Sequence, residues 1–278
     1  MNTPEQKLKS LYTIEKIFLI AWIALIAVLV IAFNLQGFGF AIFLIALPVC
    51  FFIWVFLMRK RKAFSGDNIT RDAVARSFEL LEYTYKKHID MTQLVEMPSS
   101  EWNAIGRGSD YFLARHRSVE FQFSNISLSD SDEDGSIPVF VGQWLILNLP
   151  RSNWPRMSID QYSPIGDSRR FPTVDFFSEN AAFNKQFRIM ADDPPMVPFL
   201  VTPQLVENIM ALDSATNNSA KGKKIFFIGG GHLHVILSTN RYFFEERNLS
   251  LLQNRIDNDI YCIKYIIDML LSNQKFFS

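Results

Sequence analysis

The sequence predicts an α+β protein with an N-terminal two-helix transmembrane hairpin, followed by a cytosolic, mainly antiparallel β domain with flanking helices. Three observations predict this architecture. A single long apolar block lies near the N-terminus, segments of alternating apolar and polar residues follow it, and a long amphipathic helix pattern ends the chain. Strand patterns do not alternate regularly with long helices, so a doubly wound parallel sheet is disfavoured.

The apolar block lies between Ile17 and Met58 and contains no Asp, Glu, Lys or Arg. As one helix, its 42 residues would extend about 63 Å, whereas the hydrocarbon core of a bilayer is about 30 Å thick. The polar and flexible segment 34–37 divides the block, and bare backbone cannot turn inside lipid. We therefore expect a cytosolic segment at 1–15, a first span at 16–34 and a second span at 38–58, with the hairpin occupying 16–58.

Basic residues flank the hairpin on both sides, whereas the turn between the spans carries no charge. Three lysines precede the first span and four basic residues follow the second: Lys7, Lys9, Lys16, Arg59, Lys60, Arg61 and Lys62. The positive-inside rule then predicts a multi-pass protein with both termini in the cytoplasm. A cleaved signal peptide ending near Asn34 is the alternative, but no A-x-A-like site follows it and a second span begins at once.

The 28 basic and 28 acidic residues balance, which excludes nucleic-acid binding through bulk positive charge. Outside the apolar block the composition is that of an ordinary globular chain, and no second block exists to build a polytopic transporter. The apolar block that forms the expected spans contains no charged side chain, which argues against ion conduction or proton pumping. The basic residues that follow the second span predict attraction to anionic lipid headgroups, worth about 1 kcal/mol for each residue near the surface.

A basic juxtamembrane helix is expected over 59–90, with a helix cap at Asp67 or Asn68. Its apolar residues recur at helical spacing: Val74, Phe78, Leu81, Tyr85 and Ile89. This stripe predicts a face that packs on the following domain or on a second copy of the chain.

The cytosolic α+β domain is expected over 91–278. Alternation predicts a strand around 119–123, and a run rich in Val, Ile, Trp and Phe predicts another at 137–149, with Gly142 as a candidate bulge. Residues 151–172 are expected to form a long excursion.

The later elements are expected to be strands at 173–177 and 185–190, a helix that starts at Thr202-Pro203, a β-hairpin over 225–237 and a C-terminal helix over 250–272. The parity of Phe183 and Lys185 predicts a bend or bulge near Asn184.

The acidic loop is the most obvious candidate for a metal site. It resembles the start of an EF-hand loop, with Asp130, Asp132 and Asp134 at alternate positions. The twelfth position is Val141 where a bidentate Glu is required, and the flanks predict strands rather than helices. We therefore interpret the segment as a solvated hairpin loop.

His232 and His234 alternate on one strand face, a spacing that could bind a metal ion. No third ligand is identifiable at a recognisable spacing, so a structural or exposed pair is favoured. Cys50 and Cys262 form no C-x-x-C pair, and no phosphate-binding loop, nucleophile elbow or H-E-x-x-H motif occurs. We expect no metal, no cofactor and no catalytic residues.

Four segments together resemble a known family. They are Ile105-Gly106-Arg107-Gly108-Ser109-Asp110-Tyr111-Phe112, Phe140-Val141-Gly142-Gln143-Trp144, Phe183-Asn184-Lys185-Gln186-Phe187 with the later Thr202-Pro203, and Ile225-Phe226-Phe227 with His234-Val235-Ile236. The chain is similar over about 80–270 to bacterial membrane proteins of domain of unknown function family 3137. The resemblance implies a bacterial cell (inner) membrane protein with a cytosolic domain, and it implies no reaction.

The sequence thus favours a non-enzymatic, membrane-tethered cytosolic binding or scaffold module. Its expected partners are membrane lipids and either a membrane protein or a second copy of the chain, but not nucleic acid. The alternative is a membrane-bound enzyme whose site is assembled from dispersed residues around His232 and His234. An oligomeric pore of hairpins is a third possibility that the uncharged spans disfavour.

Overall fold

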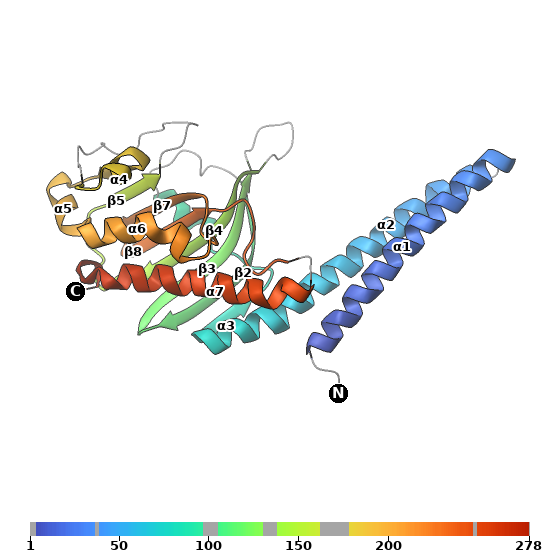
Figure 1. The fold of residues 1–278 in the computed structure, drawn as a ribbon, viewed down its shortest axis with the longest axis horizontal. Coiled ribbons are helices and arrows are strands. Elements are labelled where there is room, and N and C mark those ends of the chain that lie inside the picture. The colour runs from blue at the N-terminus through green and yellow to red at the C-terminus, as the bar shows by residue number, and fades with distance from the viewer. Residues whose placement is uncertain are drawn as a thin grey trace. The chain divides into compact units, whose positions relative to one another are not determined.

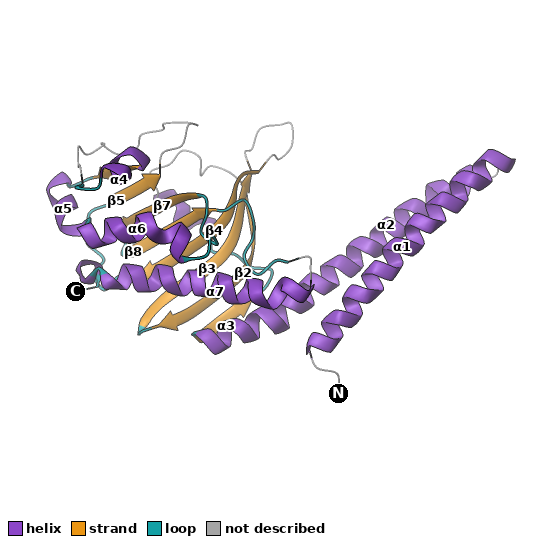
Figure 2. Cartoon of the chain, viewed as in Figure 1, coloured by secondary structure: helices purple, strands orange, loops and turns teal. Residues whose placement is uncertain are grey.

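The chain divides into two units, Met1–Asp72 and Ala73–Ser278, which are described separately. The structure is a computed structural model, and it describes these residues: 4–36, 39–96, 105–129, 138–161, 178–246 and 249–277. Figures 1 and 2 show helices in the first unit, and a sheet with helices in the second.

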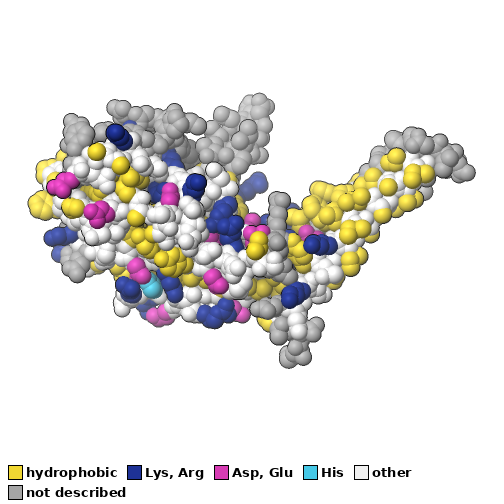
Figure 3. All heavy atoms as spheres, in the orientation of Figure 1, with side chains coloured by type: hydrophobic (Ala, Val, Ile, Leu, Met, Phe, Trp, Pro, Cys, Tyr) yellow, Lys and Arg dark blue, Asp and Glu magenta, His cyan; other side chains and the backbone are white. Residues whose placement is uncertain are grey.

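The first unit contains α1 (Pro4–Gln36) and α2 (Gly39–Phe64), which lie side by side (Figure 1). Within α1, Gln6–Val28 is long and apolar enough to cross a membrane, and its side chains are exposed or half-buried apart from Leu8. Hydrophobic side chains cover much of the visible surface of this helix pair (Figure 3). Among the residues that the structure describes, α1 is the one helix that meets this criterion. α1 ends at Gln36 and α2 begins at Gly39, close to the predicted break.

The predicted helix over 59–90 is wrong in its second half. After α2 come a π-helical segment, Ser65–Thr70, and α3 (Arg71–Ser77), and then Glu79–Thr84 form strand β1. β1 pairs with the next strand, which satisfies its backbone groups, and Leu81 of the expected packing stripe is 46% exposed. Residues 79–84 therefore form a strand, because they pair with residues about 30 positions later, although their apolar residues have helical spacing.

The second unit is built on one eight-stranded sheet in which every neighbouring pair is antiparallel. The strands lie in the order β1-β2-β3-β4-β8-β7-β5-β6. The strands after β1 are β2 (Ile105–His116), β3 (Val119–Ser129), β4 (Pro138–Asn148), β5 (Met157–Gln161), β6 (Phe187–Ala191), β7 (Lys223–Gly229) and β8 (His232–Ser238). The expected α+β class with a large antiparallel sheet and flanking helices is confirmed.

The sheet is apolar on both faces. The long helices α6 (Pro203–Ala215) and α7 (Leu249–Ser272) cross in front of it in Figure 1. Alternate strand residues point to opposite faces of the sheet, so the buried residues of β7 pack on both faces. Phe226 faces the helices, and Phe227 belongs to a cluster around Trp144 on the opposite face. This second cluster also contains Ile89, which lies outside the strands.

Several predicted elements are confirmed: the strands at 119–123 and 137–149, the hairpin over 225–237, the helix start at Thr202-Pro203 and the helix at 250–272. The predicted strand at 173–177 and the acidic loop at 130–134 lie outside the described residues.

The segment around Asn184 is helical rather than a bent strand. Asn180 caps α4 (Ala181–Gln186) by accepting hydrogen bonds from the backbone N–H groups of Ala182 and Phe183, and β6 begins only at Phe187. The change from helix to strand explains the parity conflict that predicted a bend.

Gly142 marks no bulge, because β4 keeps a regular register there with β3. A Cβ atom at this position would lie 1.8 Å from the carbonyl oxygen of Leu237 on β8. Glycine is therefore required by the close approach of two backbones.

Candidate functional site

The two predicted histidines lie together on β8, with ring centroids 6.0 Å apart. His234 is buried among aromatic rings, and the indole Nε1 of Trp144 donates a hydrogen bond to its Nδ1 at 3.3 Å. Its Nε2 is buried and has no hydrogen-bond partner among the residues that the structure describes. The predicted sharing of one strand face is therefore correct, but only His232 is partly open to solvent.

Burial, together with the smaller effect of the neighbouring His232, lowers the pKa of His234 to about 3. The imidazole is therefore neutral at physiological pH. Within the described part of the chain, no group of three His, Cys, Asp or Glu side chains is arranged to hold a metal ion. The other two histidines contact other groups: His88 bonds the carbonyl of Ile89, and His116 lies 2.8 Å from Asp268.

A buried polar network that the sequence analysis missed lies on the helix-covered face of the sheet. Its first part is Asp110, whose carboxylate accepts hydrogen bonds from the Tyr83 hydroxyl at 2.7 Å, the Ser109 hydroxyl at 2.7 Å and the Asn125 amide at 3.0 Å. Asp110 has a positive φ of 56° at a break in the β2–β3 register. That break allows its N–H to bond the carbonyl of Tyr85 beyond β1.

Asn125 extends this network to the loop that connects β8 with α7. Its Oδ1 accepts from the N–H of Phe243 at 2.7 Å and its Nδ2 donates to the Phe243 carbonyl at 3.1 Å. On the neighbouring strand, Gln143 donates to the carbonyl of Arg241 at 2.7 Å and accepts from Thr239 at 2.9 Å. The side-chain amides of Asn125 and Gln143 thus satisfy backbone groups of the loop that a neighbouring strand would otherwise satisfy.

The last part of the network joins the loop to α7. Arg241 forms a bidentate ion pair with Asp259, with distances of 2.5 and 3.1 Å, and Asp259 also accepts from the N–H of Phe244. Residues from β1, β2, β3, β4, the loop and α7 are thereby held in one continuous set of hydrogen bonds.

Burial raises the pKa of Asp110 to about 6, against the opposing effect of its three hydrogen-bond donors. Burial likewise raises the pKa of Asp259, although the Arg241 ion pair opposes the change. A perturbed carboxyl in a strained backbone conformation is a common mark of functional sites, and it also occurs in structural networks. Here the groups around Asp110 are hydrogen-bond donors that position it, and no nucleophile–base pair is assembled among the described residues of the network.

One signal in the sequence could have located this network. Asn125 continues the parity of Phe121 and Phe123, so the strand pattern places an amide on the same buried face as two phenylalanines. A polar side chain at a predicted core position requires a buried partner.

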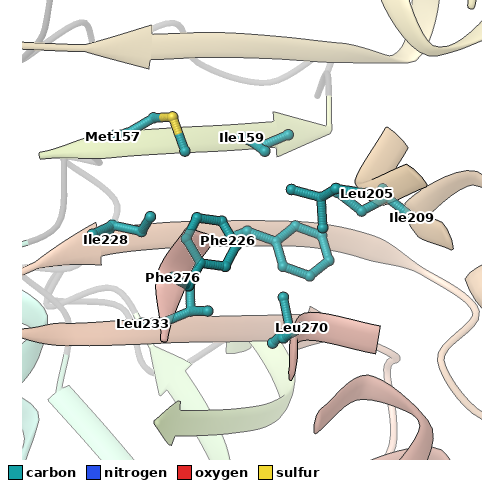
Figure 4. A pocket seen from close by; sticks show the side chains of 9 residues that line it. All are labelled: Met157, Ile159, Leu205, Ile209, Phe226, Ile228, Leu233, Leu270 and Phe276. Atoms are coloured by element: carbon teal, nitrogen blue, oxygen red, sulfur yellow. The ribbon is translucent and has the colours of Figure 1, made fainter. Parts of the chain in front are cut away.

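The helix-covered face also contains a small cavity (Figure 4), whose volume is only ≈ 10 Å³. Nine apolar side chains from the sheet, α6, α7 and the C-terminal segment line it, including Phe226, Leu205 and Leu270. A space of this size holds about one water molecule, and its lining offers no polar partner. The cavity is therefore a packing gap rather than a ligand site.

The predicted membrane-proximal basic residues differ in their environments. Arg59 and Lys60 are exposed, whereas Arg61 and Lys62 are half-buried. Arg61 pairs with Glu15 of α1 at 2.5 Å. The basic segment therefore contributes both exposed charges and a link between the two helices. The candidates Asp130, Asp132 and Asp134 lie outside the described residues.

The second unit is therefore a sheet domain with a buried polar network. The N-terminal unit of the same chain contains an apolar helix. Residues 139–272 match the model of a family described as "Protein of unknown function (DUF3137)", so the family resemblance predicted from the sequence is confirmed. The match includes all but the first residue of β4, the strands β5 to β8 and all of α7, and it contains Gln143, Arg241 and Asp259 of the network.

The structure is similar to the crystal structure of the mycobacterial trehalose monomycolate transport factor A, TtfA, with 7% sequence identity and a TM-score of 0.43. The similarity covers 74% of this chain and 94% of that chain. The comparison with curated proteins gives no match.

Proposed function

We propose that the protein is a membrane-tethered binding or scaffold module on the cytoplasmic face of a bacterial cell membrane, with α1 and α2 as a two-span anchor. One observation carries the proposal. Apart from Leu8, the side chains of the apolar stretch of α1 are exposed or half-buried, and the stretch belongs to a different unit from the sheet, which has its own core. A long apolar helix whose side chains remain largely exposed requires lipid or another apolar partner.

Contacts between the helices support an antiparallel anchor whose two outer ends meet. Glu15 near the start of α1 pairs with Arg61 near the end of α2, and the guanidinium of Arg61 lies 5.0 Å from the centre of the Tyr12 ring. Closer to the turn, the rings of Trp22 and Phe51 are 6.5 Å apart. These contacts put the charged residues at one end of the pair, as the positive-inside rule requires for two cytoplasmic ends.

The exposed basic residues support an interaction with lipid headgroups at that end. Arg59 and Lys60 are exposed and directly follow the apolar part of α2. Each would contribute about 1 kcal/mol of attraction to an anionic leaflet. The buried network of the second unit supports a rigid module, because it fixes the loop between β8 and α7 to the sheet.

Membrane extraction tests the anchor. The full chain should remain in the membrane pellet after extraction with alkaline carbonate, and a chain that begins at Ala73 should be soluble and unfold cooperatively in urea. Release of the full chain by carbonate, or detergent-dependent recovery of the shortened chain, would contradict the proposal. An unfolded shortened chain would show that the second unit depends on the first.

A further inference from the structure

A groove of ≈ 410 Å³ lies beside the first turns of α6, between the segment that leads into α4 and the short helix α5 (Val197–Leu200). Its size is within the range of small-ligand and side-chain-binding sites, roughly 300–1,000 Å³. Apolar side chains form much of its lining, and two carboxylates complete it: Pro198, Val201, Pro203, Val206, Glu179 and Glu207.

The walls of the groove are held in place by side-chain to backbone hydrogen bonds. Asn184 donates to the carbonyl of Ser178 at 2.9 Å and accepts from its N–H at 3.0 Å, which fixes the chain before α4. Opposite, the hydroxyl of Thr202 caps α6 by accepting from the N–H of Leu205 at 3.2 Å. A preformed groove reduces the ordering cost that a bound segment must overcome.

The groove combines exposed negative charge with exposed apolar surface. Glu179 and Glu207 are exposed, and neither forms an ion pair with any residue that the structure describes. On α5, Phe199 follows Pro198 of the lining and is 63% exposed, more than any other large hydrophobic side chain in the described part of the second unit. Figure 3 shows acidic and hydrophobic side chains adjoining on the surface over α5 and α6.

We propose that this groove binds a peptide segment of a partner protein that carries Lys or Arg beside an aliphatic or aromatic residue. The apolar residue would lie against the exposed Pro198 and Pro203 of the lining and against Phe199, and the cation would pair with Glu179 or Glu207. An anionic membrane surface is disfavoured as the occupant, because both carboxylates would repel its headgroups. The inference deepens the proposed binding function and names the surface and the chemistry of the partner.

Selection from a random peptide library tests the proposal. The full chain is immobilised in detergent micelles and challenged with displayed random heptapeptides, and the selected sequences are compared with the unselected library. Peptides with Lys or Arg next to an aliphatic or aromatic residue should be enriched. A selected peptide, labelled with fluorescein, should bind with a Kd that rises about threefold to tenfold in the variant Glu179→Gln/Glu207→Gln, because the exposed ion pair with the cation of the peptide is lost.

A variant with the same change in net charge is the control. Asp72→Asn/Asp257→Asn removes two exposed carboxylates outside the groove and should leave the Kd unchanged. Phe199→Ser should also weaken binding, by removing apolar contact. Enrichment of acidic peptides, absence of any enrichment, or equal effects of the groove and control variants would overturn the proposal. A groove variant that instead changes binding to anionic vesicles, with peptide binding unaltered, would also overturn it.

The outcome is separable from that of the proposed anchor. If the chain resists carbonate extraction but selects no basic peptides, the proposed anchor is supported and the proposed groove function is refuted. If the chain selects basic peptides but is released by carbonate, the proposed groove function is supported and the proposed anchor is refuted.

Discussion

The buried histidine of β8 makes a quantitative prediction about stability and pH. The pKa of His234 is about 3 in the folded protein, whereas it is about 6.5 for a histidine in an unfolded chain. The unfolded chain therefore binds a proton first as the pH falls. The contribution of this histidine is fully present above pH 6.5, and stability is lost as the pH falls from 6.5 toward 3.

The magnitude follows from the two pKa values. Each unit of difference is worth about 1.4 kcal/mol, so the complete loss would approach about 5 kcal/mol near pH 3. Between pH 7.5 and pH 5 the loss is about 2 kcal/mol, because only the interval from 6.5 to 5 contributes. Removal of the titrating group should abolish this part of the pH dependence.

The replacement His234→Asn supplies that test, because an amide oxygen at this position can still accept from Trp144 and does not titrate. The free energy of unfolding is measured from urea titrations of the full chain in detergent micelles, followed by tryptophan fluorescence at pH 7.5 and pH 5. The variant will be less stable at neutral pH through lost packing, but the difference from the unsubstituted chain should shrink by about 2 kcal/mol at pH 5. A difference that is the same at both pH values would refute the reasoning.

Three further changes test other parts of the structure. The pKa of Asp110 is raised to about 6, so the folded protein binds this proton more tightly than the unfolded chain does, and the contribution of Asp110 to stability falls as the pH rises from 3.8 to 6. From pH 5 to pH 7.5 this loss of stability is between about 1 and 2 kcal/mol. It should be absent from urea titrations of Asp110→Asn. Double-mutant analysis of Glu15→Gln and Arg61→Gln should give a coupling energy of about 1 kcal/mol or more in thermal unfolding, since both side chains are mostly buried, and independent effects would contradict the pairing. Gly142→Ala should destabilise by at least about 1–3 kcal/mol in urea, because its Cβ would meet the carbonyl of Leu237, and an unchanged midpoint would contradict that close approach.

The sequence was sufficient where a pattern depends on neighbouring residues. The helix start at Thr202-Pro203 and the hairpin around 229–231 follow from local caps, turns and periodicity, and both are confirmed. It failed at 79–84, where pairing with β2 forms a strand despite the helical spacing, and around Phe183, where the cap at Asn180 starts a short helix.

The candidate site was harder to predict, because its contacts join residues far apart in the chain. Asp110 and Asn125 are close in sequence, but Arg241 and Asp259 join the network only through the loop between β8 and α7. His232 and His234 were correctly expected to share a strand face. The burial that makes His234 neutral depends on Trp144, 90 positions earlier.

Cysteine labelling tests the central claim most directly, that two spans hold the sheet domain in the cytoplasm. With Cys50 and Cys262 replaced by alanine, single cysteines are introduced as Gly37→Cys and Ser250→Cys. An impermeant maleimide should label position 37 in intact bacteria and position 250 only after the cells are broken. Labelling of position 250 in intact cells, or protection of position 37 until the cells are broken, would contradict the account.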